Sequence, residues 1–138
     1  MSFDPSAAPP ALACLLVGND EHEELEALFA REGIDVLGVA RTGVEALNIL
    51  QQRSATAIVV DSGIADIDCL ELARRAAEIV RRQSFVIVRT GDANSLVAAR
   101  GLDAGARAIV LKSASHSNLL EALARVAAGG VYVDPALR

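Results

Sequence analysis

The sequence predicts an α/β fold in which one parallel β-sheet is covered by helices on both faces. Apolar runs of strand length alternate five times with stretches that have the apolar spacing of helices. These runs are nearly continuous, which is typical of parallel strands buried on both faces. Hydrophobic residues make up 52% of the 138 residues and aromatic residues only 3%, so the core of this single domain is aliphatic.

The first two strand–helix units occupy the N-terminal part of the chain. Residues 11–17 form a continuous apolar run of strand length, and residues 21–32 carry apolar side chains at helical spacing. Gly33 then ends this helix. Residues 34–40 alternate as a strand does, and residues 43–53 again place apolar side chains on one helical face.

The third unit begins with a β-branched run. Residues 56–60 read TAIVV, which favours a strand that is buried on both faces. Residues 69–82 are expected to form a helix with a solvated arginine face. Asp68 directly precedes this helix and is expected to cap its N-terminus.

The last two units also consist of a strand followed by a helix. Residues 85–88 and 108–111 are short apolar strands, and residues 116–130 form a helix that ends in two glycines. The helix between the two strands, residues 95–105, contains Gly101. A glycine inside a helix costs about 1 kcal/mol relative to alanine, so this helix is expected to be the least stable.

Polar side chains gather where the predicted strands end. Asn19 and Asp20 follow the first strand, Asp61 the third, Thr90 the fourth and Lys112 the fifth. Lys112 is the only lysine, and the other twelve basic residues are arginines. The carboxyl ends of parallel strands meet at one edge of the sheet, which is where such folds bind ligands. These five residues are therefore predicted to form one site.

The residue types indicate phosphoryl transfer to a carboxylate. Aspartate is a nucleophile toward phosphoryl groups, and catalysis of this reaction is mostly positioning and electrostatics. Asp20 and Asp61 provide the pair of carboxylates that suits Mg²⁺. Lys112 offers a point charge for a phosphoryl oxygen, and Thr90 offers a hydroxyl.

These residues, in this order and spacing, resemble the receiver domain of bacterial two-component response regulators. The resemblance covers roughly residues 12–130 and includes the stretch 66–72 before the third helix. It implies a flavodoxin-like, doubly wound (βα)5 sandwich with a five-stranded sheet in the order 2-1-3-4-5. Ser113 and the segment 127–138 are similar to the NarL/FixJ subfamily, whose members are LuxR-type transcription factors.

The resemblance also implies a role for each residue of the site. Asp61 is the expected phosphoacceptor, and Thr90 and Lys112 bind the phosphoryl oxygens. Mg²⁺ is the expected cofactor. Its expected ligands are Asp20, Asp61, the backbone carbonyl of Gly63 and, through water, Asn19.

A sensor histidine kinase is the partner that the resemblance implies. A homodimer is expected through one of two faces. The first consists of helix 95–105, strand 108–111 and helix 116–130, and the second of helices 21–32 and 116–130. A net charge of −5 argues against direct nucleic-acid contact by this domain, and no apolar run is long enough for a membrane span.

Three segments are expected along the chain. Residues 1–10 are a flexible leader without the features of a signal peptide, and residues 11–130 are the receiver domain. Residues 131–138 begin a linker to an absent output domain, which implies transcription regulation through DNA binding in a longer protein. The expected location is the cytoplasm.

Two departures from the family pattern keep other functions open. Asn19 stands where the family has an acidic residue, and Ile109 stands where it has an aromatic ring that moves on activation. Both favour the alternative of a pseudo-receiver, an interaction module that works without phosphorylation. A third alternative is an aspartate-nucleophile phosphatase. The first strand is followed by Asn-Asp instead of the Asp-x-Asp pattern of those enzymes, which argues against it.

Overall fold

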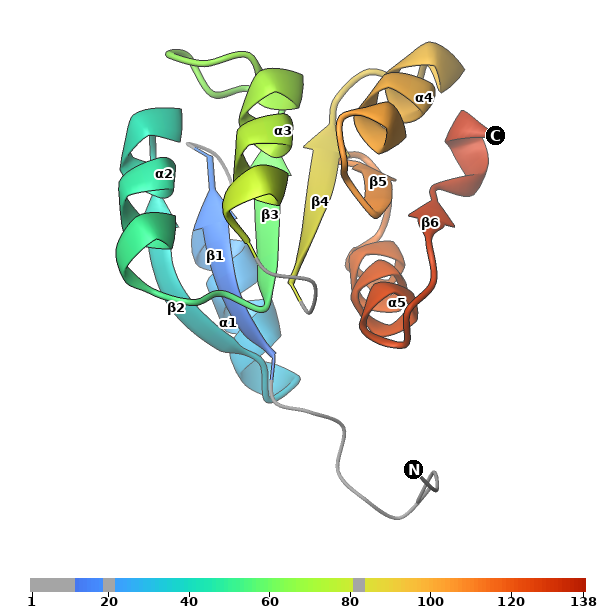
Figure 1. Ribbon diagram of the computed structural model, residues 1–138. Helices are drawn as coiled ribbons and strands as arrows, with labels where there is room; N and C mark the ends of the chain where they lie inside the picture. Colours follow the sequence, from blue (N-terminus) through green and yellow to red (C-terminus); the bar gives the residue numbers. More distant parts are fainter. Residues whose placement is uncertain (1–11, 19–21, 81–83) are drawn as a thin grey trace.

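Six parallel strands form the central sheet in a computed structural model that describes residues 12–18, 22–80 and 84–138 (Figure 1). The strand order is β2-β1-β3-β4-β5-β6. The predicted order of the first five strands is therefore correct, but the prediction missed a sixth strand. The strands are β1 (Ala13–Val17), β2 (Asp35–Ala40), β3 (Ala57–Asp61), β4 (Phe85–Thr90), β5 (Ala108–Leu111) and β6 (Tyr132–Val133).

Five helices cover the two faces of the sheet, as predicted (Figure 1). They are α1 (His22–Arg31), α2 (Gly43–Gln52), α3 (Cys69–Ile79), α4 (Ser95–Asp103) and α5 (His116–Ala127). One core cluster lies between the sheet and α2, α3 and α4, and the other lies between the sheet and α1 and α5. Among the described residues, none of the helices combines the length and apolar character needed to cross a membrane.

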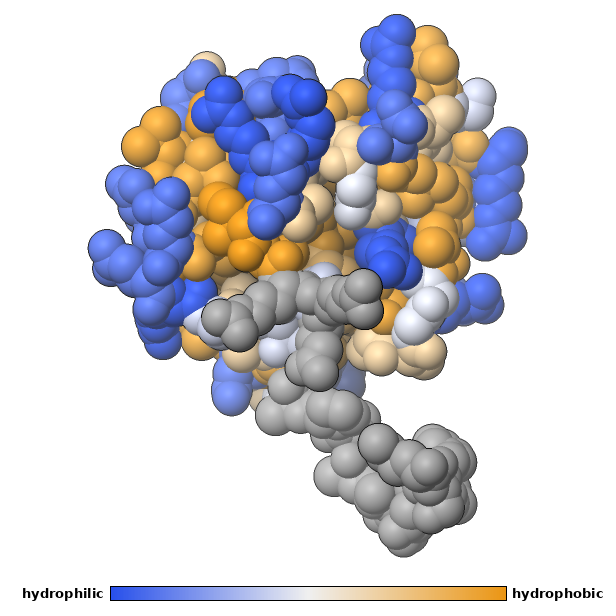
Figure 2. Space-filling view, viewed as in Figure 1, coloured by the Kyte–Doolittle hydropathy of each residue, from blue (hydrophilic) through white to orange (hydrophobic). Residues whose placement is uncertain are grey.

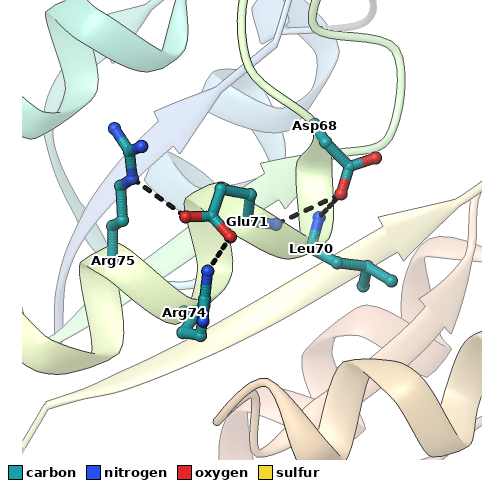
Figure 3. A network of polar contacts seen from close by, with 5 residues as sticks. All are labelled: Asp68, Leu70, Glu71, Arg74 and Arg75. Atoms are coloured by element: carbon teal, nitrogen blue, oxygen red, sulfur yellow. Dashed lines mark hydrogen bonds and ion pairs between the residues drawn. The ribbon is translucent and has the colours of Figure 1, made fainter.

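Helix α3 begins as the sequence predicts. The carboxylate of Asp68 accepts hydrogen bonds from the backbone N–H groups of Leu70 and Glu71, at 3.1 and 3.2 Å (Figure 3). Glu71 in turn pairs with Arg74 and Arg75 one turn later. Figure 2 shows that hydrophilic side chains gather along α3, with hydrophobic surface beside them. The exposed face of α3 thus carries local ion pairs, and such pairs contribute little to stability in water.

The C-terminal residues 131–138 pack onto the sheet. The backbone of β6 pairs with β5, and the side chain of Tyr132 is fully buried. Asp134 is 2% exposed, and its carboxylate accepts hydrogen bonds from the backbone of Leu111 and the amide of Asn118, both at 3.3 Å. A short 3₁₀ helix, η1 (Pro135–Leu137), follows. The start of a linker to an output domain in this segment remains a prediction.

Helix α4 packs closely against β5 at Gly101. A Cβ atom built on Gly101 would collide with Cδ1 of Ile109, whose side chain is fully buried. The glycine is therefore explained by packing, because only a residue without a side chain lets Ile109 approach α4 so closely.

Gly101→Ala is expected to lower the free energy of unfolding by up to about 2 kcal/mol, because an overpacking cost of about 1–3 kcal/mol is partly offset by a gain of about 1 kcal/mol in helix propensity. Urea denaturation measures the change. In an Ile109→Val background the colliding Cδ1 atom is gone, so the same substitution should become neutral or stabilising. An equal loss in both backgrounds would show that this contact is not the cause.

Candidate functional site

The carboxyl ends of β3, β4 and β5 bring four polar side chains to one edge of the sheet. Asp61 is the last residue of β3, Arg89 and Thr90 are the last residues of β4, and Lys112 follows β5. Asp61, Arg89 and Thr90 are each less than 5% exposed. Buried charges are rare unless they are paired, so this edge of the sheet is an unusual environment.

Asp61 and Arg89 form an ion pair between neighbouring strands. Nη1 of Arg89 lies 3.2 Å from Oδ1 of Asp61, and both side chains are almost fully buried. The two residues are register partners in the parallel β3–β4 ladder. Side chains alternate between the two faces of a strand. Val59 and Ile87, two residues earlier, belong to the α1/α5 core, so Asp61 and Arg89 extend from that same face.

Gly18 lies beside the carboxylate of Asp61. It directly follows β1, and a Cβ atom at this position would lie only 2.5 Å from Oδ2 of Asp61 and 2.9 Å from its Cβ and Cγ. Val17 of β1 pairs with Val60 of β3. Gly18 and Asp61 are the next residues along these two chain segments, so they lie side by side. The absence of a side chain at residue 18 thus makes room for the buried carboxylate.

Lys112 faces the other oxygen of Asp61. Its Nζ lies 3.9 Å from Oδ2, and its side chain is 21% exposed while that of Asp61 is 6% exposed. The backbone N–H of Lys112 donates to the carbonyl of Thr90 at 2.8 Å, which fixes the start of its loop to the end of β4. The ammonium group therefore stands between Asp61 and solvent, where an incoming anion would arrive.

Thr90 extends from the opposite face of β4. Its hydroxyl accepts a hydrogen bond from the backbone N–H of Asp92 at 3.1 Å. A hollow of about 400 Å³ opens beside it, lined by residues of the β3–α3 and β4–α4 loops and the start of α3, including Ser62 and Cys69. A larger hollow of about 1080 Å³ lies at the amino ends of the strands. We assign the chemistry to the carboxyl edge, because the paired charges lie there.

The loop that carries Gly63 is fastened to α2. The carboxylate of Asp66 accepts hydrogen bonds from the backbone N–H groups of Gly43 and Val44, at 2.8 and 3.1 Å. These hydrogen bonds lower the pKa of Asp66 from its usual value. A Cβ atom on Gly63 would lie 3.4 Å from Nζ of Lys112, so this loop passes close to the ammonium group.

The two cysteines are buried and therefore poorly suited to nucleophilic chemistry. Burial raises the pKa of the Cys14 and Cys69 thiols to about 12, so both are protonated at neutral pH. Both are free thiols.

The magnesium site implied by the resemblance is only partly described. Asn19 and Asp20 lie outside the described residues. Within residues 12–18, 22–80 and 84–138, no three His, Cys, Asp or Glu side chains gather as metal ligands do. Both oxygens of Asp61 face cationic nitrogens instead. The described residues alone therefore do not supply the full set of oxygen ligands that a divalent cation prefers.

Arg89 is the residue of the site that the sequence analysis missed. Two signals pointed to it. It interrupts the otherwise apolar run FVIVRT, where an arginine is costly unless it is paired. It also occupies the same register position in β4 as Asp61 occupies in β3. The second signal becomes visible only when the register of the sheet is known.

Comparison with known proteins supports the interpretation of the sequence. Residues 19–124 match the family described as "Response regulator receiver domain". The transcription regulator of virulence factors BvgA from Bordetella pertussis is 33% identical over 122 residues, which cover 82% of this chain and 56% of BvgA. The transcriptional activator protein ExaE from Pseudomonas putida is 31% identical over 123 residues, with coverage of 86% and 57%. The chain thus spans a little over half the length of these relatives.

Solved structures have the same fold. A LuxR-family two-component response regulator from Aurantimonas sp. superposes with a TM-score of 0.85 at 22% identity, covering 92% of each chain. The isolated receiver domain of RcsB from Salmonella enterica, solved with the phosphomimetic BeF₃⁻, superposes with a TM-score of 0.77 at 20% identity, covering 92% of this chain and 96% of that one. At these identities the likeness concerns the fold.

Proposed function

This chain belongs to the response regulator receiver domain family, and we propose that within this family Asp61 accepts the phosphoryl group. The observation that carries the proposal is a buried carboxylate at the carboxyl edge of the sheet, 3.9 Å from the ammonium of the only lysine. A carboxylate that is buried beside cations suits a nucleophile toward a phosphoryl group, because the cations offset the negative charge of the donor.

The chemical step is an exchange of bonds at phosphorus. A carboxylate oxygen of Asp61 forms a new P–O bond while the bond from phosphorus to the donor breaks. The leaving group keeps that bonding pair and is a histidine imidazole for a sensor kinase or acetate for acetyl phosphate. Lys112 holds a phosphoryl oxygen by its charge, and Thr90 offers its hydroxyl to another. The product is an aspartyl phosphate.

The partners follow from the family and belong to the proposal. A sensor histidine kinase supplies the phosphoryl group to this domain in the cytoplasm, and the modified domain changes the activity of an attached DNA-binding output. BvgA and ExaE are named as transcription regulators, which supports such an output. A homodimer through α4, β5 and α5, or through α1 and α5, is the proposed assembly. Mg²⁺ at Asp20, Asp61, Gly63 and Asn19 remains a prediction of the resemblance.

Asp61→Asn is expected to abolish phosphoryl uptake, with a loss of at least about 100-fold, because an amide is not a nucleophile toward phosphorus. The measurement is the mass increase of the intact chain after incubation with acetyl phosphate in the presence of Mg²⁺. Asp103→Asn, which changes an exposed carboxylate of α4, is the matched control and should be labelled like the native chain. Cleavage of the label by hydroxylamine would identify it as an acyl phosphate. Label that persists in Asp61→Asn would place the phosphoacceptor elsewhere.

A pseudo-receiver is the second candidate, and one observation favours it. Ile109 packs closely against Gly101, at the position where the family has an aromatic ring that moves on activation. Such a domain would bind partners without phosphorylation. The same labelling experiment separates the two functions, because a pseudo-receiver takes up no label under any condition.

A further inference from the structure

We propose that the guanidinium of Arg89 is the built-in cation of the phosphoacceptor site and takes the place of a divalent ion at Asp61. The proposal rests on the proposed function of Asp61 and adds a prediction about its cofactor. It states that the chain takes up a phosphoryl group without a divalent cation, and that Arg89 keeps such ions from binding tightly.

Arg89 is built into the sheet beside Asp61. It lies in the last part of β4 and is 2% exposed, so its place is fixed by the backbone of a central strand. Its Nη1 contacts Oδ1 of Asp61 at 3.2 Å, and the two residues are register partners. Unlike a flexible surface arginine, this side chain is held at the carboxylate before any ligand arrives.

The position of the guanidinium opposes a divalent ion. A metal ligated by Asp61 would have to share the carboxylate with Arg89 on one oxygen and Lys112 on the other. Like charges in a poorly solvated place repel strongly, because little water screens them. Among the described residues, two positive charges already face the carboxylate of Asp61, so a further cation gains less from its own charge there.

The chemistry of arginine suits the role that an ion would have. A guanidinium is planar, carries five N–H donors and binds both carboxylate and phosphoryl oxygens. During transfer, the new P–O bond forms at Asp61 and the acetate of acetyl phosphate leaves with the old bonding pair. The oxygens of the transferring group carry the negative charge. Arg89 and Lys112 then stabilise this charge from two sides without any rearrangement of solvent.

A purely structural ion pair is the alternative, and a different measurement separates it from the proposal. A structural pair affects stability and leaves the metal requirement of phosphorylation unchanged. A catalytic cation affects the metal requirement itself. The experiment therefore compares metal dependence between variants, and the overall rate of labelling is only a secondary readout.

The first arm uses the native chain. Labelling by acetyl phosphate is followed in EDTA and in Mg²⁺, and the initial rates are expected to agree within about threefold. Labelling that is abolished by EDTA overturns the proposal and leaves the proposed function intact. No label in either condition contradicts the proposed function, and the second arm then decides on Arg89 independently.

The second arm measures binding of Mg²⁺ by isothermal titration calorimetry. Arg89→Met removes the charge but keeps a long side chain, and it is expected to bind Mg²⁺ at least about tenfold more tightly than the native chain. Its labelling should now require Mg²⁺. Arg107→Met, an exposed arginine at the opposite end of the strands, is the matched control and should behave like the native chain.

Two further variants keep the test decisive. Arg89→Lys retains the charge, so its affinity for Mg²⁺ should stay within about threefold of the native value. Arg89→Gln is neutral and polar, and it replaces Arg89→Met if circular dichroism shows that the latter is unfolded. Equal Mg²⁺ affinity in the native chain and in the folded neutral variant overturns the proposal.

Discussion

Gly18→Ala is expected to destabilise the fold and to remove most of the phosphoryl uptake of this chain. The added Cβ would lie 2.5 Å from Oδ2 of Asp61. The carboxylate cannot retreat easily, because Arg89 holds its other oxygen and the side chain is 6% exposed. Overpacking of this kind costs about 1–3 kcal/mol. A displacement of about 1 Å at a reacting atom lowers a rate by about 100-fold.

Two measurements test this prediction. Urea denaturation gives the free energy of unfolding, and labelling by acetyl phosphate gives the rate of uptake. Gly38→Ala in β2 is the matched control, because no atom lies within 4 Å of the Cβ that it would add. The stability result stands even if the proposed function is wrong. Equal stability of the two variants would mean that Asp61 has room to move away from residue 18.

The order of strands and helices could be predicted because each element carries its own periodicity. The runs at 56–60 and 85–88 are apolar and β-branched, and both became strands buried on both faces. The cap at Asp68 could also be predicted, since a capping carboxylate acts on the backbone two and three residues later. These features depend on local chemistry, which a sequence displays directly.

The features that were missed depend on contacts between distant residues. Arg89 meets Asp61 across 28 positions of sequence, and only the register of two parallel strands brings them together. Strand β6 has two residues, Tyr132 and Val133, which are too few to show a period. The packing of Gly101 against Ile109 likewise needs the spacing between α4 and β5, which the sequence does not state.

The surroundings of Asp61 could be predicted from the sequence only in part. The position of Asp61 at the end of β3 could be predicted from the sequence. The position of Lys112 after β5 could be predicted in the same way. The charge state of the surrounding site could not, because it depends on Arg89. Because both oxygens of Asp61 face cationic nitrogens, its affinity for metals differs from that of a carboxylate with acidic neighbours alone.

Tyr132→Ala is expected to lower the free energy of unfolding by about 3–5 kcal/mol, as other large aromatic truncations do. The Tyr132 side chain is 2% exposed and belongs to the core between the sheet and α1 and α5. For a chain of this size, the melting temperature should fall by roughly 10–17 °C. The physical reason is that Tyr132 is buried in this core, as Leu137 of the same segment is in the other core.

The neighbouring residue provides the control for this prediction. Val131→Ala changes a side chain that is 51% exposed, so its effect should stay within about 0.5 kcal/mol. Calorimetric melting of both variants gives the comparison. If the Tyr132→Ala chain has the same melting temperature as the native chain, β6 separates from β5 in solution, as a linker would. A large loss in Tyr132→Ala alone would instead place the boundary of the domain after η1, because the buried ring holds the segment on the sheet.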